Sequence, residues 1–300
     1  MKVVITGGGG FLGAWILRRL LDEGHEVRVF DRVADRRIVR DLIGPRADTI
    51  DWRVGDVSKL DDIVAATEGW DTTIHLAGLL TPACKADPIR GAHVNLIGTI
   101  NVFEAAKRHG QRRVAYASSA GVFGPDDGAH PYPLTHYGAF KLACEGCARA
   151  YWLDDGIASV GFRPLVVYGP GREVGSSAGP TLACEAAVKA LPFTIAFTGT
   201  TNMIFVDDVA AAFVAAVLRP IEGAHALNLR GEVTTVDRII DEIRRIERNA
   251  KLSAAGPPLP ITPDITEHDV EAVLGALPHT SLRQGLEQTL AFYRRTAAAT

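Results

Sequence analysis

The chain has 300 residues, of which 22% are charged, and its formal net charge is −3. This is the composition of an ordinary globular protein, and the dispersed Lys and Arg residues do not form the basic patch that nucleic acid requires. No apolar run approaches the ~18–20 residues of a membrane-spanning helix, and the N-terminus does not resemble a secretion signal. We therefore expect a cytoplasmic protein with no membrane or nucleic-acid partner.

The chain opens with a β-branched apolar run that ends in a glycine-rich turn, followed at once by a helical pattern that starts at Phe11. Strand, glycine turn and helix in this order are the context of a dinucleotide-binding fingerprint. Gly7 permits the tight turn, Gly10 lets the backbone approach a pyrophosphate, and Gly13 lets the helix pack closely on the strand. The phosphates are expected at the helix N-terminus, where free N–H groups favour anions.

A second strand, residues 26–30, ends at Asp31, about 20 residues beyond the glycines, where a carboxylate binds the adenosine ribose hydroxyls. Strands and helices then alternate. The patterns predict strands at 50–54, 71–76 and 112–117, and helices at 35–43, 60–68 and 88–108. His75 lies at a buried strand end, so a packing role is expected there rather than acid–base chemistry.

Ser119 follows the strand 112–117, and Tyr137 and Lys141 are four residues apart in the next helical stretch. That spacing places the phenol and the ammonium on one helix face. A free phenol holds its proton at neutral pH, and both a neighbouring ammonium and an oxidised nicotinamide stabilise the phenolate. Ser119 would hold a substrate oxygen while Tyr137 exchanges its proton. Alone, such a pair is usually a chance match on a surface helix; the glycine turn favours the catalytic interpretation.

The alternation loosens after a strand at 157–163. The patterns predict a loop at 169–180, helices at 181–190, 236–249 and 281–295, short strands at 193–197 and 226–229, and a Pro-rich connection at 253–263. Asp207 and Asp208 begin an Ala-rich helix, which favours N-capping and dipole stabilisation over a metal pair. Cys84, Cys144, Cys147 and Cys184 are interpreted as buried reduced thiols, and no metal is expected because no histidine or cysteine spacing fits a metal site.

Motifs along most of the chain resemble those of extended short-chain dehydrogenases/reductases, also called the NAD-dependent epimerase/dehydratase family. They are Thr6-Gly-x-x-Gly-x-x-Gly13, Asp31, Asp56-Val57, His75-Leu-Ala-Gly78, Asn95, Ser118-Ser119, Tyr137-x-x-x-Lys141, Arg163-Pro164 and Tyr168-Gly-Pro-Gly171. The resemblance implies an α/β fold, a Rossmann doubly wound parallel sheet with a small C-terminal substrate-binding lobe. Residues 1–168 would form the NAD-binding domain, with the sheet completed by parts of 190–230, and residues 169–300 would form most of the lobe.

The same resemblance implies an NAD site and assigns its residues. Asp56 faces the adenine, Asn95 helps to position the active site, and Pro164, Leu165 and Val166 line the nicotinamide. The full cofactor set is Gly7, Gly10, Phe11, Leu12, Gly13, Asp31, Arg32, Asp56, Val57, Leu76, Ala77, Gly78, Asn95, Ser118, Tyr137, Lys141, Pro164, Leu165 and Val166.

Three function classes fit these motifs: a dehydrogenase that releases NADH, an epimerase or dehydratase that retains the cofactor, and a non-catalytic dinucleotide sensor. The catalytic set argues against the sensor. Dehydratases of the family carry an Asp-Glu pair after the catalytic Ser, where this chain has Ala120 and Gly121. Nucleotide-sugar binders usually carry an Arg at the position of Thr201 and another in the C-terminal lobe, where residues 252–282 contain no Lys or Arg. Without these partners for a diphosphate, a dehydrogenase acting on a small sugar, sugar acid or polyol acid is expected.

Substrate contacts are expected from Leu79, Leu80, Thr81 and Ser119, with Arg172 as a clamp for a carboxylate; the alternative for Arg172 is a solvated loop residue. The resemblance also implies a homodimer, because in the family the helices that match 88–108 and 137–153 pair across a two-fold axis.

Overall fold

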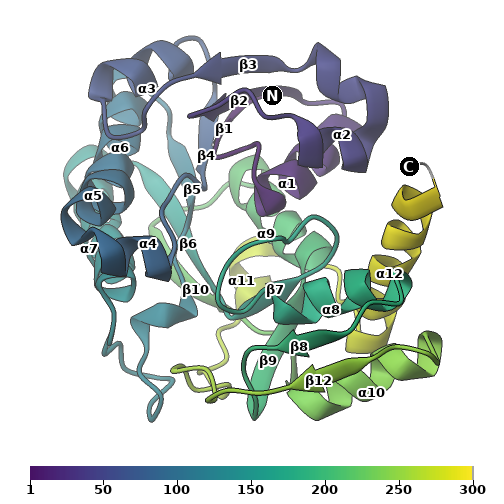
Figure 1. Cartoon of the computed structure of the whole chain (residues 1–300). Helices are drawn as coiled ribbons and strands as arrows, with labels where there is room; N and C mark the ends of the chain where they lie inside the picture. The colour runs from purple at the N-terminus through teal and green to yellow at the C-terminus, as the bar shows by residue number, and fades with distance from the viewer. Residues whose placement is uncertain (299–300) are drawn as a thin grey trace.

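The computed structural model describes residues 1–298, and a seven-stranded sheet forms its centre (Figure 1). The strands are, in sheet order, β10 (Ala224–Leu229), β6 (Ala158–Pro164), β5 (Arg113–Ala117), β4 (Thr72–His75), β1 (Lys2–Thr6), β2 (Glu26–Asp31) and β3 (Asp51–Val54). All of their pairings are parallel. The strand order reverses between β1 and β4, and in such sheets ligands bind beyond the carboxyl ends of the strands at this point.

Helices cover both faces of this sheet (Figure 1). One face carries α1 (Phe11–Asp22), α2 (Arg37–Ile43) and α9 (Val206–Leu218), and the other carries α3 (Leu60–Thr67), α6 (Gly98–His109) and α7 (His136–Asp155). The side chains of β1, inside the sheet, point alternately to the two faces. Val3 and Ile5 belong to the core on the first face and Val4 to the core on the second. A strand buried on both faces needs apolar residues at every position, which is what the N-terminal run supplies.

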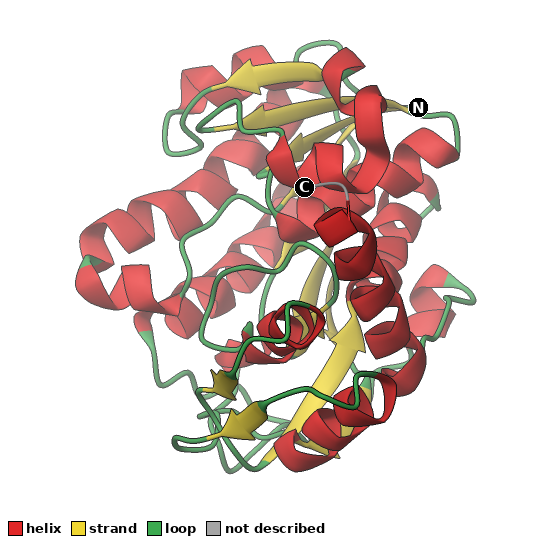
Figure 2. Cartoon of the chain, turned by 45° about the vertical axis from the view of Figure 1, so that its right-hand side comes forward, coloured by secondary structure: helices red, strands yellow, loops and turns green. Residues whose placement is uncertain are grey.

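The C-terminal third builds a smaller group of elements at one end of the sheet, visible below it in Figure 2. It contains a three-stranded sheet, β11-β9-β7, a parallel pair, β12-β8, and four helices. Their bounds are β7 Val166–Tyr168, α8 Gly179–Val188, β8 Phe193–Ile195, β9 Thr200–Phe205, β11 Glu232–Thr235, α10 Val236–Ile246, β12 Leu252–Ala254, α11 Val270–Leu274 and α12 Leu282–Ala298. The division of the chain into two domains stays a prediction.

The helix expected at 88–108 is helical throughout but not uniform. It consists of α5 (Pro88–Ala92), a π-helical turn (His93–Ile97) and α6, and a short helix α4 (Thr81–Ala86) precedes it. α6 packs closely on the segment after β3, since a Cβ added at Gly98, its first residue, would lie 3.0 Å from the Val57 side chain. The π turn carries Asn95, and single π turns in helices often lie at functional sites.

The N-capping role expected for Asp207 and Asp208 is wrong. The N-cap of α9 is Phe205 and makes no side-chain capping bond, while both acids lie in the first turn. Asp207 accepts hydrogen bonds from the Arg19 guanidinium at 2.7 and 2.9 Å, and Asp208 accepts two from Thr280. These side chains tie α9 to α1 and to the segment before α12. The expectation of four buried thiols also needs correction, since Cys147 is only partly buried.

Candidate active site

A cavity of about 720 Å³ lies beyond the carboxyl ends of β1, β2, β4, β5 and β6. This volume falls within the about 300–1,000 Å³ of typical ligand sites. Every residue proposed from the sequence to contact cofactor or substrate lines this cavity, with the exception of Asn95. Its lining includes the glycine turn, Asp31, Tyr137 and the segment 259–261.

The glycine turn has the close contacts that its sequence requires. Gly7 has φ = +71°, and an added Cβ there would lie 2.8 Å from the Ala77 nitrogen. A Cβ on Gly13 would lie 2.6 Å from the Gly7 oxygen, so α1 packs directly on the turn. Gly10 caps α1 without a side-chain bond, and a Cβ there would approach only the Gly7 oxygen within 4 Å. The free amides at the start of this 12-residue helix therefore border an open cradle suited to an anion.

Two carboxylates line the cavity at the ends of β2 and β3. Asp31 accepts hydrogen bonds from the backbone nitrogens of Gly9 (3.1 Å) and Arg32 (2.7 Å), and burial raises the pKa of its carboxyl. Asp56 accepts bonds from the backbone and hydroxyl of Ser58, which lower its pKa. With the anion cradle beside them, these groups fit a dinucleotide: amides for the pyrophosphate, Asp31 for a ribose and Asp56 for an adenine.

Asn95 acts on the cavity through the backbone. Its amide oxygen accepts from the Leu79 nitrogen and its amide nitrogen donates to the Leu79 oxygen, both at 3.1 Å. A Cβ on Gly78 would lie 2.6 Å from the same amide oxygen. The side chain therefore fixes the segment after β4, which lines the cavity.

Ser119, Tyr137 and Lys141 converge on one end of the cavity. A Cβ placed on Gly121 would lie 3.2 Å from Ser119 Oγ and 3.7 Å from the Tyr137 ring, so these two side chains flank the same small volume. Ser119 Oγ accepts a hydrogen bond from the Gly121 nitrogen, which leaves its own proton available to a ligand. Lys141 is 4% exposed, lies 5.7 Å from the Tyr137 ring centroid and donates to the Ala117 oxygen at 2.6 Å.

Arg172 lies in the cavity wall near Tyr137, but its guanidinium already has partners. It donates to the Val167 oxygen and to Ser177 Oγ (2.8 Å). Burial lowers the pKa of Arg172 to about 10, and the nearby Tyr137 acts in the opposite direction. The residue stays charged at neutral pH, held within its own loop.

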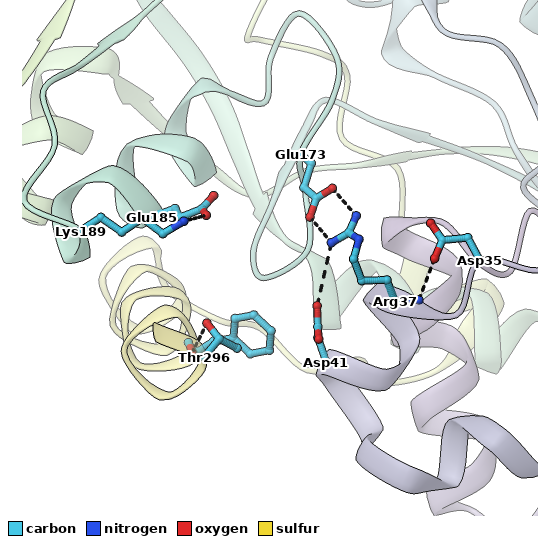
Figure 3. Close-up of polar contacts among 8 residues, drawn as sticks. Asp35, Arg37, Asp41, Glu173, Glu185, Lys189 and Thr296 are labelled. Atoms are coloured by element: carbon cyan, nitrogen blue, oxygen red, sulfur yellow. Dashed lines mark hydrogen bonds and ion pairs between the residues drawn. The ribbon is translucent and has the colours of Figure 1, made fainter. Parts of the chain in front are cut away.

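The loop that contains Arg172 is tied across the cavity to the helices that follow β1 and β2. Trp15 Nε1 on α1 donates to the Pro170 oxygen at 3.0 Å. Arg37 on α2 forms a two-pronged ion pair with Glu173, at 2.7 and 2.6 Å, and Figure 3 shows this side chain reaching from α2 to the loop. The loop thus closes one side of the proposed cofactor site.

Beneath the catalytic residues lies a buried polar network. Glu145 is on α7, one turn beyond Lys141, and accepts hydrogen bonds from Ser118 Oγ and from the Arg163 guanidinium. The Glu145 and Arg163 side chains are only 3% and 10% exposed. The network connects the strand end that carries Ser119 to the helix that carries Tyr137 and Lys141. The serine hydroxyl of Ser118 faces Glu145, so a contact of Ser118 with a cofactor would use its backbone.

His75 is fully packed, as expected for a role outside the chemistry. Its ring nitrogens lie 2.7 Å from Thr6 Oγ1 and 3.1 Å from Thr99 Oγ1. Burial, with Lys141 adding to it, lowers the pKa of His75 to about 3. The imidazole is therefore neutral at physiological pH.

This burial predicts a pH effect on stability. Between the pKa of a free His, about 6.5, and about 3, the unfolded chain binds a proton at His75 and the folded chain does not. The free energy of unfolding should thus fall as the pH falls through this window, by up to about 1.4 kcal/mol per unit. The free energy of unfolding is measured with denaturant at several pH values from 6 to 4. Its slope against pH should be shallower for His75→Gln than for the wild type. The exposed His93→Gln serves as control; identical slopes for wild type and His75→Gln would rule out this assignment.

Several cavity residues were not expected from the sequence. Phe123 and Leu134 come from the segment between β5 and α7, and Leu259, Pro260 and Ile261 come from the Pro-rich connection after β12. Apolar residues before a helix or in a connection carry no sequence signal for a cavity.

No helix among residues 1–298 is long and apolar enough to cross a membrane.

Comparisons with known proteins agree with this architecture. The model of the NAD dependent epimerase/dehydratase family matches residues 3–229. The chain is 28% identical to a UDP-glucose 4-epimerase of Mycolicibacterium smegmatis over 98% of this chain and 99% of that protein. It is 33% identical to the human 3 beta-hydroxysteroid dehydrogenase type 7, over 57% of this chain and about half (51%) of that protein. The fold superposes with a TM-score of 0.82 on a Thermus thermophilus UDP-glucose 4-epimerase in complex with NAD, at 24% identity over 98% of this chain and 99% of that one.

Proposed function

The chain belongs to the NAD-dependent epimerase/dehydratase family, and we propose that it is an oxidoreductase that oxidises a secondary alcohol or lactol and releases NADH. The observation that carries this proposal is the convergence of Ser119, Tyr137 and Lys141 at the end of a cavity that begins at the glycine turn. When bound, NAD supplies the hydride acceptor, so that an alcohol and NAD become a carbonyl compound, NADH and a proton.

The chain's own residues would then handle the proton. Ser119 donates its free hydroxyl hydrogen to the alcohol oxygen and orients it, while Tyr137, as phenolate, accepts the hydroxyl proton. The Lys141 ammonium, held by the Ala117 carbonyl, stabilises the phenolate. Proton and hydride leave the same alcohol, so neither charge develops alone.

The second candidate is a nucleotide-sugar epimerase that retains NAD, favoured by the full-length similarity to a UDP-glucose 4-epimerase. Against it, Thr201 is buried in β9 opposite Thr234 and does not line the cavity, so a cation for a diphosphate is absent there. The small sugar, sugar acid or polyol acid expected from the sequence is one candidate for the alcohol; the steroid dehydrogenase relatives point to a less polar one.

One screen tests the proposal. The protein is incubated with NAD and panels of aldoses, uronic acids, aldonic acids, hydroxysteroids and nucleotide sugars. Absorbance at the reduced-nicotinamide band reports oxidation, and product analysis reports inversion. NADH from a non-nucleotide alcohol supports the dehydrogenase, and an inverted nucleotide sugar without NADH supports the epimerase.

Asp31 should make the site prefer NAD over NADP. Its carboxylate would face a 2′-phosphate, and like charges brought together cost enough for a preference of about tenfold or more. Arg32 and Arg36 follow Asp31 and could bind the 2′-phosphate of NADP. Arg36, however, donates to the Ala47 and Ile50 carbonyls and stacks on Trp52, so of these two only the exposed Arg32 stays available. Titration of the protein with both cofactors measures the ratio of the two affinities. NADP binding as tight as NAD binding would refute the predicted preference. Asp31→Ser should narrow the ratio.

We also propose that the protein is a homodimer built on α5, α6 and α7. Ile89 on α5 is 75% exposed and Leu153 on α7 is 74% exposed, as unpaired interface residues would be in a single chain. Sedimentation in dilute solution should give about twice the 32.1 kDa of one chain. A mass equal to one chain would exclude the dimer.

A further inference from the structure

Apolar side chains from four separate segments line the cavity outside the residues proposed for the cofactor. They are Leu80 before α4, Phe123 and Leu134 between β5 and α7, Val174 in the loop after β7, and Leu259 and Ile261 after β12. Leu80 and the loop meet, since an added Cβ on Gly175 would lie 3.4 Å from Leu80 Cδ1. We call this apolar region the substrate end.

Three of these side chains are unusually exposed for large apolar residues. Leu80 is 42% exposed, Leu134 is 55% exposed and Val174 is 71% exposed. Each comes from a different segment, yet all line one cavity. Apolar surface gathered at a cavity mouth gains free energy when an apolar ligand covers it.

The charged side chains that line the cavity near Tyr137 already have hydrogen-bond partners within the protein. The Arg172 guanidinium donates to the Val167 carbonyl and to Ser177, and Glu173 is bound by Arg37. Lys141 is held at the Ala117 carbonyl. The Thr135 hydroxyl accepts from the Gly138 nitrogen as the N-cap of α7.

The apolar side chains of the substrate end offer no hydrogen bonds to the hydroxyls of a polyhydroxylated substrate. A buried hydroxyl that finds no partner costs free energy. Among the described lining residues, the hydroxyl side chains whose protons stay available to a ligand are Thr81, Ser119, Thr135, Ser176 and Ser177. A cavity with apolar walls and few polar groups selects a ligand of the same pattern.

We propose that the substrate is a secondary alcohol on an apolar ring or chain, with the carbinol at Ser119 and Tyr137 and the apolar body against the substrate end. This inference rests on the proposed oxidation and narrows its substrate class, away from the carbohydrate expected from the sequence.

The test uses cyclohexanol, cycloheptanol and cyclooctanol, each with one methylene more than the last. Calorimetry measures the affinity of each for the protein–NADH complex, which has no hydride acceptor, and NADH absorbance in reactions with NAD measures kcat/KM. Burying one methylene changes affinity about three- to fourfold, so both quantities should rise by about that factor at each step. myo-Inositol and glucose, with polar rings, should bind more weakly than cyclooctanol.

Val174→Asp probes the wall without disturbing the core, because Val174 is mostly exposed. This variant should flatten the increase in affinity per methylene. Leu191→Asp, at an exposed leucine outside the cavity lining, is the matched control and should retain the increase.

The outcomes separate this inference from the proposed function. NADH formed from glucose or inositol but not from the cycloalkanols would overturn the apolar substrate and keep the oxidation. Cycloalkanols that bind with rising affinity but give no NADH would support the apolar site and contradict the oxidation. Equal affinity for all three rings, in wild type and Val174→Asp alike, would overturn the apolar site.

Discussion

Tyr137→Phe should lower kcat by about 10²–10⁴-fold while leaving the affinity for NAD nearly unchanged, since that is the usual contribution of a positioned acid–base group. The phenol lies beside Ser119 and Lys141 at the end of the cavity, and the substitution removes only its hydroxyl. No residue among the described part of the chain donates a hydrogen bond to that hydroxyl, so its loss should leave no partner unsatisfied. Steady-state kinetics and a fluorescence titration of NAD measure the two effects.

Tyr132→Phe is the matched control, because Tyr132 is 72% exposed and does not line the cavity. It should retain wild-type turnover. Full activity in Tyr137→Phe would show that another group moves the proton. A parallel loss of NAD affinity and turnover would indicate a binding role instead.

Glu145→Gln should lower the free energy of unfolding by about 3–5 kcal/mol, the usual cost of removing one partner from a buried ion pair. Arg163 would remain buried on β6 without its carboxylate, and Ser118 would lose a charged acceptor. Turnover should fall as well, because this network joins the strand end of Ser119 to the helix of Tyr137 and Lys141. Denaturant unfolding at neutral pH gives the stability change.

A second substitution separates the lost pair from lost packing. Arg163→Met in the Glu145→Gln background should recover part of the stability, because the unpaired charge is then removed. Glu287→Gln breaks the exposed pair with Arg283 on α12 and should change stability little. A Glu145→Gln variant as stable as the wild type would mean that the pair is not what joins these elements.

The Rossmann part of the fold could be predicted because its sequence signals are local. The run Lys2–Thr6 is apolar at each position from Val3 to Ile5, as a doubly covered strand requires. Gly7 and Gly13, which follow it, have backbone contacts that exclude a Cβ. The spacing of Tyr137 and Lys141 on one helix likewise fixed their relation before any tertiary information. The cavity residues assigned by family resemblance are brought together by the parallel strand ends.

The rest depended on contacts between distant segments. The strands β7, β9 and β11 are three to six residues long and pair across gaps in sequence, so no periodicity distinguishes them from loop. The π turn at Asn95 follows the same apolar pattern as an ordinary helix. Leu259 and Ile261 belong to a Pro-rich connection, and only the folded chain brings them into the same cavity lining as Leu80. For the same reason, the sequence could not show that the Arg172 guanidinium already has hydrogen-bond partners in the fold.

Net oxidation can be measured as the ratio of NADH formed to alcohol consumed. Purified protein is incubated with excess NAD and an alcohol that it consumes, and both quantities are followed in one reaction. We expect one NADH for each molecule of alcohol consumed, with the carbonyl compound as product. Substrate converted to its inverted epimer, with no NADH accumulating, would instead show that the protein is an epimerase.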